Sequence, residues 1–183
     1  MTGILNTLRR LSLCGVILLA PINALAGDQE SASATIDTTT FYLIRHTEKE
    51  LDAGKDPNLT DQGRYRADYW AAVLKNVVID RVYSTDTLRT RETAAPFARA
   101  HDLEIEFYSP SKIDYAEFIK TNLNKTVVVV GHSNTTPGFA NGLLGREDYQ
   151  DLDDSNYSSL FVVDIVGDTR IGRVFYIEAQ MPD

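Results

Sequence analysis

Apolar and polar positions form blocks along the chain, and after residue 40 these blocks have the lengths of strands and helices. Short runs rich in β-branched and aromatic residues predict strands at 41–46, 77–84, 103–108, 126–132, 158–166 and 171–179. Longer amphipathic stretches predict helices at 59–76, 86–100, 111–123 and 136–145. Because strands and helices alternate, we expect a mostly parallel central sheet covered on both faces, a three-layer α/β/α sandwich. The last two strands flank a Gly-Asp turn and predict a hairpin at the sheet edge.

Several residues predict where the helices begin and end. Polar residues in cap positions mark the helix starts: Thr60, Ser111 paired with Asp114 in a capping box, and Thr136 before Pro137. Gly145 predicts the end of the fourth helix. Pro96 lies inside the second helical stretch and predicts a kink or a break there.

The first 26 residues have the pattern of a signal peptide. Arg9 and Arg10 precede an apolar run at 11–22 that is too short to span a bilayer. Ala24-Leu25-Ala26 then supplies a small-x-small cleavage pattern. We therefore expect a signal peptide at 1–26, a flexible leader at 27–39, a folded domain at 40–183, and export to the periplasm or outside the cell. A retained membrane anchor and a buried N-terminal helix are the alternatives.

Composition narrows the possible partners. The sequence has one cysteine, Cys14, so cleavage after Ala26 would leave a chain without any disulfide. The formal net charge is −8, and cleavage would remove two arginines and no acidic residue. Such an acidic domain argues against nucleic-acid binding, and we expect no stable membrane insertion after cleavage. An anionic ligand would need a local basic pocket, and the sequence leaves the oligomeric state open.

Candidate reactive residues gather where predicted strands end. Arg45 and His46 end the first strand, Arg89 follows the second, and His132 ends the fourth. Carboxyl ends of parallel strands are where ligands bind in such folds. Only three histidines occur in the chain, and two of them lie at these ends. The third, His101, is interpreted as an ordinary structural histidine.

Ser133 raises the alternative of a serine hydrolase. The sequence Gly-His-Ser at a strand end is similar to a nucleophile elbow, Gly-x-Ser-x-Gly. Here the last position is Thr135, and no histidine follows residue 132, where that catalytic triad requires one. Ser133 is therefore only a remote candidate nucleophile, and a turn-capping role suits it better.

Two arginines and two histidines instead indicate phosphate chemistry. Arginine offers a planar fork of donors that matches phosphate oxygens and keeps its charge. Two arginines and one histidine could hold a phosphate dianion while a neutral imidazole attacks phosphorus and forms a phosphohistidine. We expect no metal and no cofactor, because these side chains supply the positive charge and no zinc-type ligand cluster is present in the sequence.

Four ordered motifs resemble those of the histidine phosphatase superfamily, the phosphoglycerate-mutase-like fold. They are Arg45-His46-Thr47-Glu48, Leu59-Thr60-Asp61-Gln62-Gly63 with Arg66, Tyr83 to Ala94, and Val130-Gly131-His132-Ser133. The resemblance spans roughly 41–145. It implies His46 as the phosphorylated nucleophile, and Arg45, Arg89 and His132 as the phosphate pocket. The short chain, without large insertions, is similar to the compact phosphatases of this superfamily.

The chain also departs from the family pattern. Thr47 replaces the usual Gly or Ala, and Ser133 replaces the Asp that follows the second histidine in the phytase and acid-phosphatase branch. Asp114 is the first candidate for the general acid, with helix capping as its alternative role. We predict an exported, metal-independent histidine (acid-type) phosphatase acting on a small phosphorylated substrate. A phosphate-binding or sensing module of the same fold, with little or no turnover, is the alternative.

Overall fold

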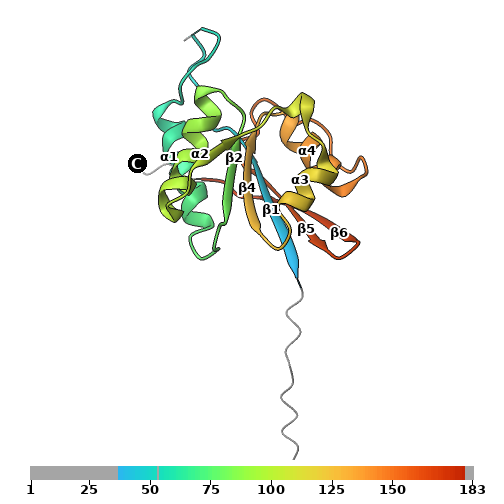
Figure 1. Cartoon of the computed structure of the whole chain (residues 1–183). Coiled ribbons are helices and arrows are strands. Elements are labelled where there is room, and N and C mark those ends of the chain that lie inside the picture. The colour runs from blue at the N-terminus through green and yellow to red at the C-terminus, as the bar shows by residue number, and fades with distance from the viewer. Residues whose placement is uncertain (1–36, 53, 180–183) are drawn as a thin grey trace, which may run out of the picture. The chain divides into compact units, whose positions relative to one another are not determined.

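The computed structural model describes residues 37–52 and 54–179, so the predicted signal peptide lies outside the described residues. In chain order the elements are β1 (Thr38–Arg45), α1 (Asp61–Val73), β2 (Arg81–Ser84), α2 (Leu88–His101), β3 (Ile105–Phe107), the 3₁₀ helix η1 (Pro110–Lys112), α3 (Tyr115–Thr121), β4 (Thr126–Gly131), α4 (Thr135–Leu144), β5 (Ser159–Val166) and β6 (Thr169–Tyr176) (Figure 1). Within the described ranges, no helix has the length and apolar content needed to cross a bilayer.

The six strands form one sheet in the order β3-β2-β4-β1-β5-β6. The first four of these strands are parallel, while β5 pairs antiparallel with β1, and β6 with β5. In the register, Arg45 lies opposite Gly131, and Ser84 opposite Val130. The carboxyl ends of β1, β2 and β4 therefore meet at one edge of the sheet, where the candidate residues follow them.

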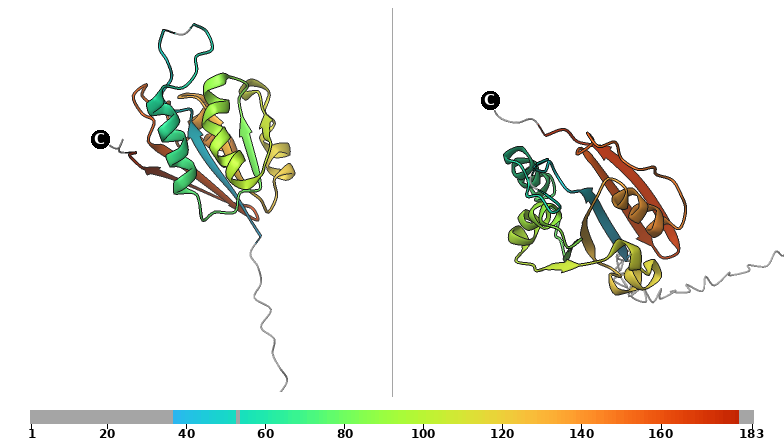
Figure 2. Two further views of the ribbon diagram at one scale, coloured as in Figure 1. Left: turned by 90° about the vertical axis from the view of Figure 1, so that its left-hand side faces the viewer. Right: turned by 90° about the horizontal axis from the view of Figure 1, so that it is seen from above.

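Helices α1 and α2 cover one face of the sheet, and α3 and α4 cover the other, as Figure 2 shows in the view from above. On one face, Trp70 of α1 and Phe97 of α2 pack against Ile44, Val128 and Val130. The other face has its own cluster, in which Ile119 of α3 and Phe139 and Leu143 of α4 cover alternate strand residues. These strand residues are Phe41, Leu43, Val127 and Val129. The predicted three-layer α/β/α sandwich, with a mostly parallel sheet and an edge hairpin, is confirmed.

Some predicted boundaries are wrong by a few residues. The first strand begins at Thr38, inside the predicted leader, because Thr38 and Thr39 pair with the end of β5. Thr39 is buried, and its hydroxyl accepts a hydrogen bond from the Asn124 backbone N–H. Helix α2 runs through Pro96 without a break. Strand β2 begins only at Arg81, four residues later than predicted.

Helix caps follow the prediction at α1 but not at α3 or α4. Thr60 caps α1 as predicted, because its hydroxyl accepts the Gly63 N–H at 3.0 Å. The predicted capping box at Ser111 does not form, since η1 occupies that segment and Asp114 itself caps α3. Helix α4 starts at Thr135, one residue before the predicted cap at Thr136, and the left-handed Gly145 ends it as expected.

Candidate active site

His46 follows β1 directly and is held in one orientation. Its backbone N–H donates to the Gly131 carbonyl at 2.9 Å, and its side chain is almost fully buried. The ring atom Nδ1 lies 2.8 Å from the Thr47 carbonyl oxygen. Because a carbonyl can only accept, Nδ1 carries the proton, and the lone pair lies on Nε2.

The surroundings of His46 keep its imidazole neutral. Burial lowers the pKa of His46 to about 3, with smaller contributions from His132, Arg45 and Arg89, while the Thr47 carbonyl acts in the opposite direction. At neutral pH the ring is therefore uncharged and has a free Nε2 lone pair. These are the properties that a nucleophilic histidine needs.

His132 follows β4 and lies beside His46, with the two ring centroids 5.4 Å apart. Its Nε2 lies 2.9 Å from the Thr85 hydroxyl oxygen, and that hydroxyl donates onward to Thr90. Nε2 therefore carries the proton. Burial first, and then the positive charges of Arg89, Arg45 and Lys49, lower the pKa of His132 to about 4. Both histidines are thus neutral at pH 7.

Arg45 is fixed by the loop that precedes β5. Its Nη1 donates to the backbone carbonyls of Asp153, Asp154 and Asn156 at 2.9–3.1 Å. Its guanidinium carbon lies 4.3 Å from the centre of the Tyr157 ring, a cation–π contact. Within the described ranges the buried Nε has no hydrogen-bond partner.

Arg89, in the first turn of α2, supplies the second guanidinium. Its Nη1 lies 3.5 Å from a carboxylate oxygen of Asp56, which also accepts the Leu88 N–H, and its Nη2 lies 3.5 Å from Nδ1 of His132. Its Nε is likewise buried and unpartnered among the described residues. Buried donors normally find an acceptor. The oxygens of a bound phosphate would supply acceptors for the Nε groups of both arginines.

These side chains line one pocket of about 570 Å³ at the carboxyl ends of the strands. The lining residues are Arg45, His46, Lys49, Leu51, Arg89, His132, Ser133, Asn134, Asp154 and Tyr157. The structure therefore brings together all four residues that the sequence singled out for phosphate chemistry. Their chemical roles remain predictions.

Other candidates are placed differently. The Asp114 carboxylate accepts the Glu117 N–H at 3.1 Å and does not line the pocket, so its place is that of a helix cap. Ser133 lines the pocket, and within the described residues its hydroxyl has no hydrogen bond to a histidine. Nothing here activates Ser133 as a nucleophile.

Sequence reasoning missed several contacts of this site. Tyr157 and Asp56 lie in none of the four motifs, although each contacts an arginine of the candidate phosphate site. Glu48, which ends the first motif, forms a nearly buried ion pair with Arg66 at 2.8 Å. The acidic segment around Asp153 binds a cation through backbone carbonyls, and that cation is Arg45. In the part of the chain that the structure describes, no three His, Cys, Asp or Glu side chains are grouped as metal ligands would be.

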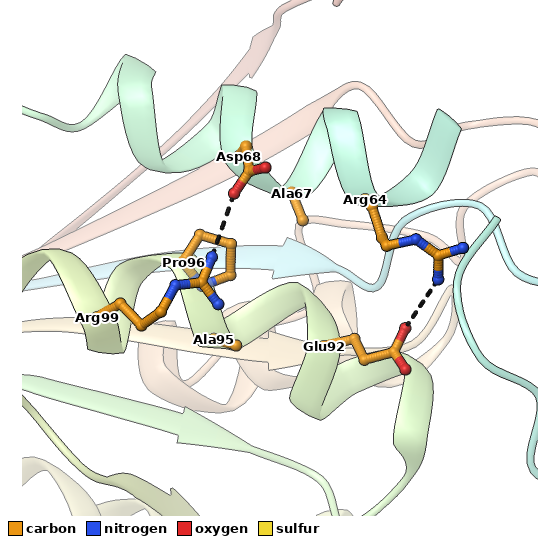
Figure 3. A pocket seen from close by; sticks show the side chains of 7 residues that line it. All are labelled: Arg64, Ala67, Asp68, Glu92, Ala95, Pro96 and Arg99. Atoms are coloured by element: carbon orange, nitrogen blue, oxygen red, sulfur yellow. Dashed lines mark hydrogen bonds and ion pairs between the residues drawn. The ribbon is translucent and has the colours of Figure 1, made fainter. Parts of the chain in front are cut away.

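A smaller hollow of about 220 Å³ lies between α1 and α2 (Figure 3). Its charged side chains pair across it: Arg64 lies 3.8 Å from Glu92, and Arg99 lies 3.4 Å from Asp68. Neither candidate histidine lines this hollow. We therefore place the chemistry in the pocket at the strand ends.

Comparisons with known proteins agree with this geometry. The family model of the histidine phosphatase superfamily (branch 1) matches residues 41–109 of this chain. No curated protein matches the chain. The match to a phosphatase superfamily supports phosphatase chemistry for the pocket.

Solved structures share the fold at low sequence identity. The protein histidine phosphatase SixA complexed with tungstate is 19% identical, with a TM-score of 0.60, over 75% of this chain and 96% of that one. A phosphoserine phosphatase mutant from Entamoeba histolytica, in complex with phosphoserine, is 19% identical with a TM-score of 0.58 over 73% and 94%. A mycobacterial glucosyl-3-phosphoglycerate phosphatase is 13% identical with a TM-score of 0.57 over 78% and 100%. The predicted resemblance to the histidine phosphatase superfamily is thus confirmed, in sequence over residues 41–109 and in fold over about three quarters of the chain.

Proposed function

We propose that this protein is an exported, metal-independent phosphomonoesterase that works through a phosphohistidine on His46. One observation carries the proposal: a neutral, oriented His46 shares a pocket with two guanidinium groups whose buried Nε donors have no partner in the described structure. Arg45 and Arg89 would bind the phosphoryl oxygens and stabilise the charge that develops on them.

The reaction has two steps. The Nε2 lone pair of His46 attacks phosphorus, the ester P–O bond breaks, and the leaving oxygen takes the electron pair and a proton from solvent water. Water then attacks the phosphohistidine and returns one proton to solvent, the P–N bond breaks, and inorganic phosphate leaves while Nε2 regains its lone pair. The Thr47 carbonyl keeps Nδ1 protonated and stabilises the positive charge that forms on the ring.

The carboxylates near the site are engaged in other contacts, and this favours substrates with good leaving groups. Glu48 is paired with Arg66, and Asp114 caps α3. Among the described residues, Asp154 is the one carboxylate that lines the pocket, and it lies 3.7 Å from Arg45. A poor leaving group needs a positioned acid, whereas a phosphorylated imidazole needs much less help. A phosphate ester with a good leaving group therefore suits this pocket.

Export rests on the N-terminal sequence pattern alone. Expression of the full chain in a Gram-negative host should yield a periplasmic product whose mass corresponds to cleavage after Ala26. A cytoplasmic product of full length would contradict export without affecting the proposed chemistry.

Phosphate release from 4-nitrophenyl phosphate in EDTA tests the enzyme. Its leaving group is good enough that a missing general acid would not hide turnover. We expect turnover by the wild type and by His101→Ala, a control that removes the histidine away from the pocket, and a loss in His46→Ala of at least about 10³-fold. Equal rates for His46→Ala and the wild type would exclude His46 as the nucleophile.

The alternative, a phosphate-binding or sensing module, has its own result in this assay. A folded wild-type domain that binds phosphate but does not release it from any aryl ester would favour that module. Ser133→Ala should keep the turnover of 4-nitrophenyl phosphate, which has no second acidic group, and its inactivation would revive the serine-hydrolase alternative.

A further inference from the structure

Arg45 and Arg89 form the proposed phosphate clamp of the pocket. The pocket contains one further cationic side chain. Arg45 lies 3.7 Å from Asp154, and Arg89 lies 3.5 Å from Asp56, so each arginine has a carboxylate nearby. Lys49 also lines the pocket, and among the described residues its ammonium group makes no ion pair. In a chain whose net charge is −8, this lysine adds a positive charge to the pocket beyond those of the two arginines.

The backbone of Lys49 is fixed by pairing with the segment that precedes α1. It forms an isolated antiparallel bridge with Leu59, and the neighbouring Glu50 N–H donates to the Asn58 carbonyl at 2.9 Å. The side chain is only partly exposed, and its charge contributes to the lowered pKa of His132. The ammonium group therefore acts on the interior of the pocket.

Two further polar side chains line the same pocket. Ser133 and Asn134 lie between His132 and the start of α4. Over residues 37–52 and 54–179, neither the Ser133 hydroxyl nor the Asn134 side-chain amide makes a hydrogen bond. A hydroxyl, an amide and an ammonium group together can donate to a carboxylate.

The size of the pocket leaves room for more than a phosphate. Its volume of about 570 Å³ lies in the range of small-molecule sites, which is roughly 300–1,000 Å³. Arg45, Arg89 and the two histidines account for the phosphoryl group, so the remaining polar groups face the rest of the substrate.

We propose that Lys49, with Ser133 and Asn134, forms a subsite for a second acidic group, so that the substrate is a small phosphorylated acid. This inference rests on the proposed function, because it places the phosphoryl group in the clamp of Arg45 and Arg89. It differs from a general preference for anions, since the second group must lie on the same molecule as the phosphate.

Two non-hydrolysable ligands test this subsite without any turnover. 3-Phosphonopropionate and propylphosphonate have the same chain length, and differ in that one ends in a carboxylate and the other in a methyl group. In calorimetric titrations, the wild type should bind the carboxylate ligand about ten-fold more tightly, as expected for one charge-assisted contact. Lys49→Met should bring this ratio close to one, Lys49→Arg should restore most of it, and the surface control Lys75→Met should keep it.

The possible results separate the two proposals. A wild-type ratio near one, or a ratio that persists in Lys49→Met, would overturn the subsite. An equal weakening of both ligands in Lys49→Met leaves the ratio unchanged, would assign Lys49 to the phosphate clamp, and also overturns the subsite. Failure of the phosphatase proposal appears in a different experiment, as missing turnover of 4-nitrophenyl phosphate, while these binding ratios remain measurable.

Discussion

Gly63 sits where α1 touches the peptide that orients His46, so Gly63→Ala is a sensitive test of the site. A Cβ at this position would clash with the Glu48 carbonyl oxygen, and would lie 3.0 Å from the Glu48 carbonyl carbon and 3.1 Å from its nitrogen. That nitrogen belongs to the same peptide group as the Thr47 carbonyl that accepts from His46 Nδ1. The Thr47 hydroxyl also donates to the Gly63 carbonyl at 2.7 Å, so the two segments have little freedom to separate.

The size of the effect follows from this geometry. Non-bonded carbon atoms pack at about 3.5–4.0 Å, so relief of the clash requires the Glu48 backbone, including the peptide it shares with Thr47, to move by roughly 0.5–1 Å. Misplacement of a reacting group by about 1 Å can cost on the order of 100-fold in rate. We therefore expect Gly63→Ala to lower kcat for 4-nitrophenyl phosphate by about 10- to 100-fold. Overpacking should also lower the free energy of unfolding by about 1–3 kcal/mol.

Gly138→Ala provides the matched control. Gly138 also lies in a helix, and a Cβ added there meets no atom within 4 Å. Alanine stabilises a helix by about 1 kcal/mol relative to glycine. This variant should therefore keep the wild-type kcat and have a higher free energy of unfolding in urea. If Gly63→Ala instead matched Gly138→Ala in both kcat and unfolding free energy, the contact between α1 and the His46 loop would have no role in positioning the nucleophile.

Three further predictions concern the same region. Arg66→Met should lower the free energy of unfolding by about 3–5 kcal/mol in urea titrations, because it leaves Glu48 nearly buried without its partner; a loss below 1 kcal/mol would contradict this. NMR titration should show neither His46 nor His132 protonating between pH 8 and 5, since their pKa values lie at about 3 and 4. The unfolded chain takes up these protons near pH 6.5, so stability should be full above that pH and should fall on acidification toward pH 4; a ring inflection between pH 6 and 7 would refute this. Thr85→Val should lower kcat/KM about ten-fold, because the His132 Nε2–H loses its acceptor, and an unchanged pH-independent kcat/KM would exclude that role.

The fold was predictable because local patterns decide most of it. The run Val127–Val130 is buried on both sides of the sheet, and this is why four successive valines form the central strand β4. Asp114 shows the limit of local reasoning: the same carboxylate could have been a general acid or a helix cap, and only the start of α3 at Tyr115 decides its place.

The site was predictable as far as it follows strand ends. His46 and His132 meet because the register pairs Arg45 with Gly131, a consequence of parallel pairing that the sequence allowed us to expect. The partners of these residues come from distant segments. Tyr157 reaches Arg45 across more than a hundred residues, and no local spacing encodes that contact.

The phosphoryl group on His46 is the central claim, and it can be trapped directly. The wild type would be mixed with a large excess of 4-nitrophenyl phosphate, quenched in alkali, where phosphohistidine survives, and digested for mass spectrometry. The account predicts one added phosphoryl group on the peptide that contains His46, and none in His46→Ala. A phosphoryl group on His132 or on Ser133, or rapid turnover without any covalent adduct on His46, would contradict it.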